Sequence, residues 1–265
     1  MAGGDQLRTL REQRHESLEH IAFDANITYK TLWKIEQGKT RQPMRAILDA
    51  ILEALHNCAP VHIEERRAIY AAYGYHPPFP LPEDAERVEA CEHWRAEYGG
   101  TPMPAYLIDM GQQVLAWNAA APRLVGLHPR DRRVWQFENA TTIDLTFGLV
   151  ERFVTIENLE AYRCSFVGTL KRELRPYEAE DWYTPCIAAA QRRYPDFKRL
   201  WAMEHPPPVS PIGCPVPLKV CLPGYSDALT FHRLKIPFAG DPRFQTVLWQ
   251  PMDAATLRTW GMLLS

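Results

Sequence analysis

The chain has 265 residues, of which 46% are hydrophobic, and its 30 Lys and Arg nearly balance 32 Asp and Glu. This length favours two domains over one small domain, and the net charge of −2 excludes a chain that is basic throughout. The sequence contains no apolar run long enough to span a membrane, and its first residues lack a signal-peptide core. We therefore expect a soluble, cytoplasmic protein with no membrane partner.

Residues 17–38, SLEHIAFDANITYKTLWKIEQG, predict two short helices joined by a tight turn. Ser17 and Thr28 are typical N-caps, and Asn26 between them tolerates the left-handed conformation that such a turn requires. Gly38 then ends the second helix. Apolar residues recur at helical spacing in the two helices: Leu18, Ile21, Ala22, Ala25, Ile27, Leu32 and Ile35. The pattern indicates a helix-turn-helix, with an ordinary helical hairpin as the alternative.

The outward face of the second predicted helix is polar and cationic, and positive residues continue beyond it. A surface that follows the phosphate backbone of DNA has this composition. The candidate DNA-binding residues are Thr28, Tyr29, Lys30, Thr31, Lys34, Lys39, Arg41 and Arg45. We expect the last three to contact phosphates and the others to lie near base edges.

Residues 7–43 resemble the Cro/repressor-type (XRE) helix-turn-helix. The positions that match this family are Leu7, Arg8, Arg11, Ser17, Ile21, Ala22, Ile27, Thr28, Leu32, Ile35, Glu36, Gly38 and Pro43. The resemblance implies a structural ion pair between Arg11 and Glu36. The chain departs from the family at Leu18, where a DNA-contacting Gln is common, so base recognition would depend more on Tyr29, Lys30 and Lys34.

Further helical patterns over 44–55 and 61–75 complete a five-helix, all-α domain at 1–76. The proline-rich stretch PPFPLPED predicts a stiff linker, which with a helix over 82–97 forms a connecting segment at 77–100. The six cysteines include no Cys-x-x-Cys pair, and Cys214 and Cys221 have no histidine at zinc-finger spacing. We therefore expect reduced thiols and no metal site, with a redox sensor as the alternative.

From residue 101 the pattern becomes mixed α and β, which predicts an α+β domain at 101–265 with an antiparallel sheet covered by helices. A hairpin is predicted over 105–118, followed by a helix over 119–127 with Asn118 as its N-cap. A long helix is expected to carry both Phe153 and Leu170, and two more helices over 182–194 and 195–203. A proline-rich loop over 205–217, three strands (218–222, 228–236 and 244–251) and a terminal helix over 253–264 complete the domain.

A hairpin followed by an Asn-capped helix is how PAS-type sensor domains usually begin. The segments HIEERRAIYAAYGY, AYLIDMGQQVLAWNAAAPRLVG and RRYPDFKRLW, with the last paired strands, resemble the MmyB-like transcription regulators. Residues 131–180 match that family poorly. The resemblance implies a one-component regulator that joins an XRE helix-turn-helix to a PAS-like ligand-binding domain. We expect a homodimer on double-stranded DNA, with an inverted-repeat operator.

Aromatic residues are abundant in the second domain, and a PAS-like sheet covered by helices commonly leaves a cavity. We expect a cavity that takes a small apolar or amphipathic effector, such as a fatty acid. The candidate ligand-binding residues are Trp117, Phe147, Phe153, Phe166, Phe197, Trp201 and Phe231. His232 and Arg233 are the candidates for meeting a carboxylate at the mouth of the cavity.

The sequence contains no recognised catalytic motif, so we expect no cofactor and no enzyme activity. Two alternatives remain. The second domain could be an enzyme domain that is fused to a DNA-targeting module, or it could serve only for dimerisation. Turnover of a co-purified molecule would favour the first alternative, and a solid core without a cavity would favour the second.

Overall fold

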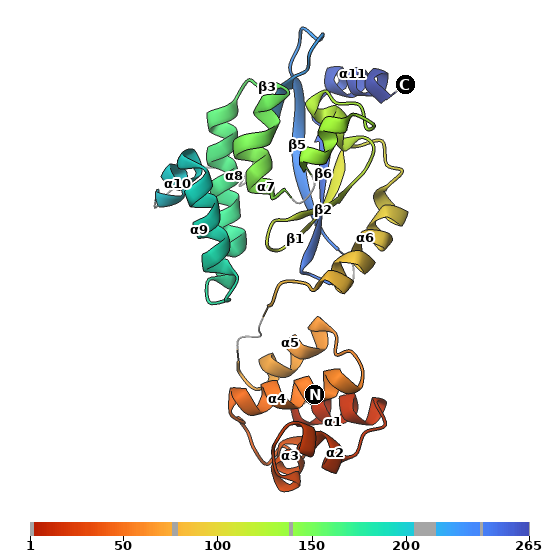
Figure 1. Ribbon diagram of the computed structural model, residues 1–265, viewed down its shortest axis with the longest axis vertical. Helices are drawn as coiled ribbons and strands as arrows, with labels where there is room; N and C mark the ends of the chain where they lie inside the picture. The colour runs from red at the N-terminus through yellow and green to blue at the C-terminus, as the bar shows by residue number, and fades with distance from the viewer. Residues whose placement is uncertain (1–2, 76–78, 138–139, 204–215, 239–240, 265) are drawn as a thin grey trace. The chain divides into compact units, whose positions relative to one another are not determined.

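The computed structural model describes residues 3–75, 79–137, 140–203, 216–238 and 241–264. The chain divides into two compact units, 1–79 and 80–265, which are considered separately below (Figure 1). The predicted start of the linker, most of the predicted proline-rich loop and Cys214 lie outside the described residues. Within the described ranges, no helix is both long and apolar enough to cross a membrane.

The first unit is all-α, as predicted. Its helices are α1 (Gly3–Gln13), α2 (Leu18–Asp24), α3 (Tyr29–Glu36), α4 (Arg45–Cys58) and α5 (Ile63–Ala72). They surround one apolar core, to which each helix contributes at least one side chain, including Leu7, Ile21, Leu32, Leu52 and Ile69.

The turn between α2 and α3 forms as its local sequence predicts. The hydroxyl oxygen of Ser17 accepts a hydrogen bond from the backbone N–H of His20 at 3.1 Å, and that of Thr28 accepts one from Thr31 at 3.2 Å. Asn26 has a φ of 51° and Gly38 a φ of 65°, so both occupy the left-handed region that ends a helix. These caps fix where α3 begins and ends.

The second unit contains a six-stranded antiparallel sheet in the order β2-β1-β6-β5-β4-β3. The strands are β1 (Ala105–Asp109), β2 (Val114–Trp117), β3 (Thr155–Ile156), β4 (Leu218–Cys221), β5 (Leu229–Pro237) and β6 (Phe244–Pro251). The predicted hairpin and the three predicted later strands are therefore confirmed. The antiparallel sheet with helices on it is the α+β fold that the sequence predicts (Figure 1).

One face of the sheet is covered by α6 (Asp84–Tyr98). The fully buried Trp94 of this helix packs against Ala105 and Leu107, and its indole N–H donates a hydrogen bond to the hydroxyl of Thr246 at 3.1 Å. The second compact unit begins at Pro80, so it includes the helix that the sequence analysis assigned to the connecting segment.

The opposite face of the sheet packs against a long helix, α8 (Leu159–Leu174). Two more helices, α9 (Tyr183–Arg193) and α10 (Pro195–Ala202), pack against α8, and α11 (Ala254–Leu264) contacts β5 and β6. Strand register decides which side chains point toward α8. Tyr106 pairs with both Trp117 and Val247, and Arg233 pairs with Trp249. Directly paired residues share a face, so these side chains line one side of the sheet.

Two predicted helices differ from those observed. The helix expected to carry Phe153 begins only at Leu159, because Ile156 pairs with Val220 and forms β3. The helix expected over 119–127 is a 3₁₀ helix at Ala121–Val125, although the side chain of Asn118 does accept a hydrogen bond from the backbone N–H of Ala121 at 3.0 Å. Further short 3₁₀ helices (Arg132–Phe137, Val150–Arg152) and a π turn (Leu145–Leu149) surround α7 (Thr142–Asp144).

Candidate functional site

A polar, cationic strip lies along α3 and the loop that follows it. Seven of the eight predicted DNA-binding side chains are exposed. The eighth, Thr31, is partly exposed. The core side of the same helix holds Leu32 and Ile35, both fully buried. The helix therefore presents Tyr29, Lys30 and Lys34 outward from the first unit while its apolar face anchors it.

One lysine of this strip contacts an aromatic residue of α3. The ammonium of Lys39 lies 4.0 Å from the ring centroid of the partly buried Trp33. Such a cation–π contact holds the lysine charge near the end of α3, because the face of the indole ring is negative. Trp33 thus links the helix to the positive loop that follows it.

Arg11 of α1 and Glu36 of α3 form a two-pronged ion pair. The Nε and Nη2 atoms of Arg11 donate to the two carboxylate oxygens of Glu36, each at 2.8 Å. Glu36 is only 3% exposed, and the hydrogen bonding that its carboxylate accepts from Arg11 raises the pKa of Arg11. Arg11 also donates to the backbone oxygen of Glu16 at 2.8 Å. One guanidinium therefore fixes α3 to α1 and to the start of α2.

Helix α1 approaches α3 closely at a second point. A Cβ atom at Gly4 would lie 2.4 Å from the backbone oxygen of Ile35 and 2.7 Å from that of Glu36. Only glycine fits there without moving backbone. The position of α3 within the first unit is therefore defined by the contacts of α1 as well as by the turn.

The second unit contains a partly open apolar cavity of about 90 Å³ between the sheet and the segments that cover it. Aromatic and aliphatic side chains form nearly all of its wall: Tyr106, Val114, Trp117, Ala121, Pro122, Leu124, Val125, Val134, Phe137, Leu145, Thr146, Val150, Ile156, Tyr162, Leu218 and Trp249. A space of roughly 10–15 Å³ on this measure holds one water molecule. An engineered cavity of about 150 Å³ holds one benzene molecule, so this cavity takes a smaller apolar group.

Three polar groups of the wall cluster where the sheet meets α8. They are the hydroxyls of Tyr106 and Tyr162 and the indole N–H of Trp249. Within the described part of the chain, the buried N–H of Trp249 makes no hydrogen bond of ordinary geometry, and the hydroxyl of Tyr106 is the polar group close to it. Burial raises the pKa of both tyrosines, and the positive charge of Arg233 opposes that rise in both. Both phenols are therefore neutral donors near a cation.

Arg233 is a buried cation on the cavity side of the sheet. It is 8% exposed, its strand partner Trp249 lines the cavity, and its guanidinium carbon lies 5.0 Å from the ring centroid of Phe166. Among the residues that the structure describes, it forms no ion pair with a carboxylate. The next cationic residue on the same face, Lys235, does have a partner. Its ammonium nitrogen lies 2.5 Å from a carboxylate oxygen of Glu173 on α8. A buried charge is costly without a partner, so Arg233 is suited to meet an anion.

The structure places most of the predicted ligand-binding side chains away from this cavity. Of the seven nominated side chains, Trp117 alone is on the cavity wall. Phe147, Phe166, Phe197 and Trp201 instead form a separate cluster with α8, α9 and α10, in which the ring centroids of Phe147 and Phe197 are 5.4 Å apart. These rings are used in packing helix against helix, so they are not available to a ligand in the cavity.

The other two nominated side chains also lie outside the wall. Phe153 packs behind Phe137, with ring centroids 5.6 Å apart, and Phe231 packs edge-on against Trp260 at 5.4 Å. Of the two candidates for a carboxylate, Arg233 shares the cavity face, whereas His232 pairs with Gln250 on the opposite face. Successive side chains of β5 point to opposite faces of the sheet, so only one of these two neighbouring residues can lie on the cavity side.

Sequence reasoning missed Tyr106, Tyr162 and Trp249 as site residues. The strand segments AYLID and TVLWQ contained the available signal for these residues. Side chains of a strand alternate between its two faces, which places Tyr106 and Trp249 on one face of their strands. That signal gives no information on which face holds the cavity. Tyr162 is one of many buried residues on α8, and nothing in its spacing distinguishes it.

Comparison with family models matches residues 99–259 to the MmyB-like transcription regulator ligand binding domain. The matched segment lies within the second compact unit and contains every residue that lines the cavity. Comparison with curated proteins finds no match.

Proposed function

The chain belongs to the family of the MmyB-like transcription regulator ligand binding domain, and on that basis we propose that it is a one-component transcription regulator. In this proposal the first unit is an XRE-type helix-turn-helix that reads DNA, and the second binds a small apolar acid that controls it. The observation that supports the ligand most directly is an apolar cavity beside a buried guanidinium that forms no ion pair with any described residue. A cavity also argues against a second unit that serves only for dimerisation.

For DNA, we propose that α3 enters the major groove. Tyr29, Lys30, Thr31 and Lys34 would then reach base edges, with Thr28 at the start of the helix. Lys39, Arg41 and Arg45 lie on the exposed loop and the start of α4, where they would contact phosphates. A homodimer would place two recognition helices about 34 Å apart, which predicts an inverted-repeat operator.

The two groups of residues should respond differently to substitution. We expect Lys39→Ala and Arg41→Ala to weaken binding to all sequences alike and to reduce the salt dependence of affinity by about one phosphate contact each. Lys30→Ala should instead cost about 1–3 kcal/mol at one base pair and relax the preference there. Fluorescence anisotropy against an operator selected from a random library, and against its single-base variants, measures both effects over a salt series.

Lys198→Ala is the matched control, because it removes an exposed lysine of the second unit. It should leave affinity and salt dependence unchanged. If the Lys30 and Lys39 variants gave the same profile across all operator variants, the division into base-reading and phosphate-contacting residues would be wrong.

For the effector, we propose a carboxylic acid with an alkyl or aromatic body, such as a fatty acid. The body would fill the apolar cavity, and the carboxylate would accept hydrogen bonds from Arg233 and from Tyr106, Tyr162 or Trp249. A charge-assisted hydrogen bond to guanidinium is among the stronger polar contacts, and here it would also supply the counter-charge that Arg233 lacks. Regulation requires only a coupling of about 1–3 kcal/mol between this site and DNA.

The cavity volume predicts a dependence on chain length. Across a series of straight-chain carboxylic acids, affinity should rise by about 0.8 kcal/mol per methylene until the cavity is full. Scaling from an engineered cavity of about 150 Å³ that holds benzene places that limit at roughly three to five carbons, and longer acids should gain little. Isothermal titration calorimetry of protein that has been stripped of lipid measures the series. Matched alcohols control for burial of the alkyl chain, and an affinity that does not depend on chain length would contradict binding inside the cavity.

A further inference from the structure

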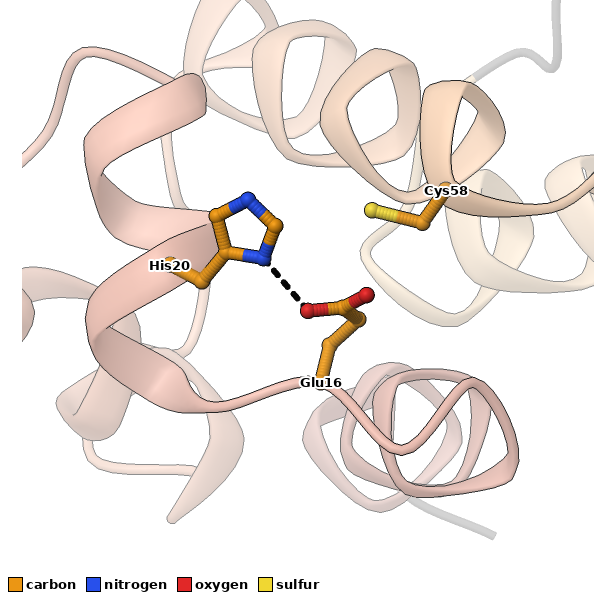
Figure 2. Close-up of side chains that lie close together, drawn as sticks. All are labelled: Glu16, His20 and Cys58. Carbon is orange, nitrogen blue, oxygen red and sulfur yellow. Dashed lines mark hydrogen bonds and ion pairs between the residues drawn. The ribbon is translucent and has the colours of Figure 1, made fainter.

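Three side chains of the first unit converge although they come from separate segments (Figure 2). Glu16 precedes α2, His20 lies on α2, and Cys58 is the last residue of α4. One oxygen, one ring nitrogen and one sulfur from these residues all lie within 4.8 Å of one another. All three side chains are at least partly accessible, and Figure 2 shows the thiol and the carboxylate directed toward the same edge of the imidazole.

The far side of the imidazole also has a carboxylate partner. Nδ1 of His20 contacts Glu16, whereas Nε2 lies 3.3 Å from a carboxylate oxygen of Asp24. A metal ion at Nδ1 would take the place of the proton that now lies between His20 and Glu16, and Nε2–H would then donate to Asp24. A histidine that ligates a metal typically donates its other N–H to a carboxylate in this way, which fixes the ring and its tautomer.

We propose that Glu16, His20 and Cys58 bind one divalent transition-metal ion of the zinc class, with a fourth position for water. Thiolate, imidazole and carboxylate together favour Zn²⁺ or Co²⁺ over Mg²⁺ or Ca²⁺. In a tetrahedral zinc site the ligand atoms lie about 3.5 Å apart, so small rotations of accessible side chains suffice.

The local charge favours a cation at this position. The carboxylates of Glu16 and Asp24 lie on either side of the His20 ring. A bound metal ion would offset that negative charge and hold Cys58 as a thiolate, because a coordinated thiol is deprotonated outright. The ion would also connect α2 to the end of α4 and so hold in place the helix that packs against α3. Spacing along the chain gave no indication of this site, since its three ligands come from separate segments.

Cobalt titration of the full chain tests the proposal. After removal of metal with a chelator, we expect one Co²⁺ per chain to produce a thiolate-to-cobalt charge-transfer absorption that Zn²⁺ then removes by displacement. Cys58→Ser should abolish that band. His20→Gln should weaken binding at least tenfold, and Asp24→Asn should weaken it about 10- to 100-fold through the orientation of His20.

Cys164→Ser is the matched control, because it removes a partly buried thiol from the second unit and should leave the band unchanged. Circular dichroism of each variant verifies that its helices are intact, and Cys58→Ala replaces Cys58→Ser if the latter unfolds. A missing band in the wild-type chain would overturn the proposal. So would a band that survives loss of the Cys58 thiol, or binding that is insensitive to both His20→Gln and Glu16→Gln.

Discussion

Replacing Arg11 with methionine is expected to lower the free energy of unfolding of the first unit by about 3–5 kcal/mol. The substitution leaves Glu36, which is 3% exposed, as a buried anion without its two guanidinium hydrogen bonds. It also removes the donor to the backbone oxygen of Glu16. Hydrogen exchange of the full chain, followed peptide by peptide, should show amides of α1 and α3 exchanging roughly 150- to 5,000-fold faster, unless the whole unit unfolds.

A double substitution distinguishes a stranded charge from lost packing. Arg11→Met combined with Glu36→Met replaces both charges by apolar groups, and should recover most of the lost stability because neither partner is then stranded. Arg8→Ala removes the exposed Arg8–Asp5 ion pair of the same helix and should change little. If the double variant were no more stable than Arg11→Met alone, the loss would come from packing and not from the charge on Glu36.

The second large effect concerns Arg233 and the proposed acidic effector. Arg233→Met should reduce affinity for a short-chain carboxylic acid by roughly 30- to 5,000-fold, which corresponds to about 2–5 kcal/mol for truncating one partner of a buried, hydrogen-bonded charge pair. Affinity for the matched alcohol should change little, since its binding depends on the apolar wall. Titration calorimetry of both ligands against both proteins gives the comparison.

The same substitution should not destabilise the ligand-free protein. Arg233 lacks a carboxylate partner among the described residues, so replacing it with an apolar side chain removes a costly buried charge. The control variant is Arg172→Met, which changes an exposed arginine of α8. Equal losses for acid and alcohol would indicate a collapsed cavity, and no loss for the acid would place the carboxylate elsewhere.

Local signals in the sequence predicted the first unit well. The caps at Ser17 and Thr28 and the left-handed turn at Asn26 depend on a few adjacent residues, so they can be inferred without tertiary structure. The exposed face of α3 follows from the same periodicity, because burying Leu32 and Ile35 leaves Lys30 and Lys34 outside. Whether these lysines bind DNA remains a prediction.

The cavity was predicted less well, because its wall depends on contacts between distant segments. An aromatic residue such as Phe197 has the same hydrophobic signal whether it packs against another helix or lines a cavity, and here it packs against Phe147. Ile156 has helical spacing with Leu159 but pairs with Val220 on a strand far along the chain. Strand pairing outweighed local periodicity at that position.

The order of strands in the sheet affects folding during synthesis and the behaviour of truncated fragments. Ala105–Asp109 pairs with Phe244–Pro251, so β1 lacks one of its two neighbours until Phe244–Pro251 has left the ribosome. Until then the emerging β1–β2 hairpin exposes unpaired backbone N–H and C=O groups, which can form hydrogen bonds with strands of other copies of the chain. A fragment that ends before residue 244 would retain that exposed edge permanently. We therefore expect such fragments to aggregate, whereas fragments that extend through β6 should remain dispersed.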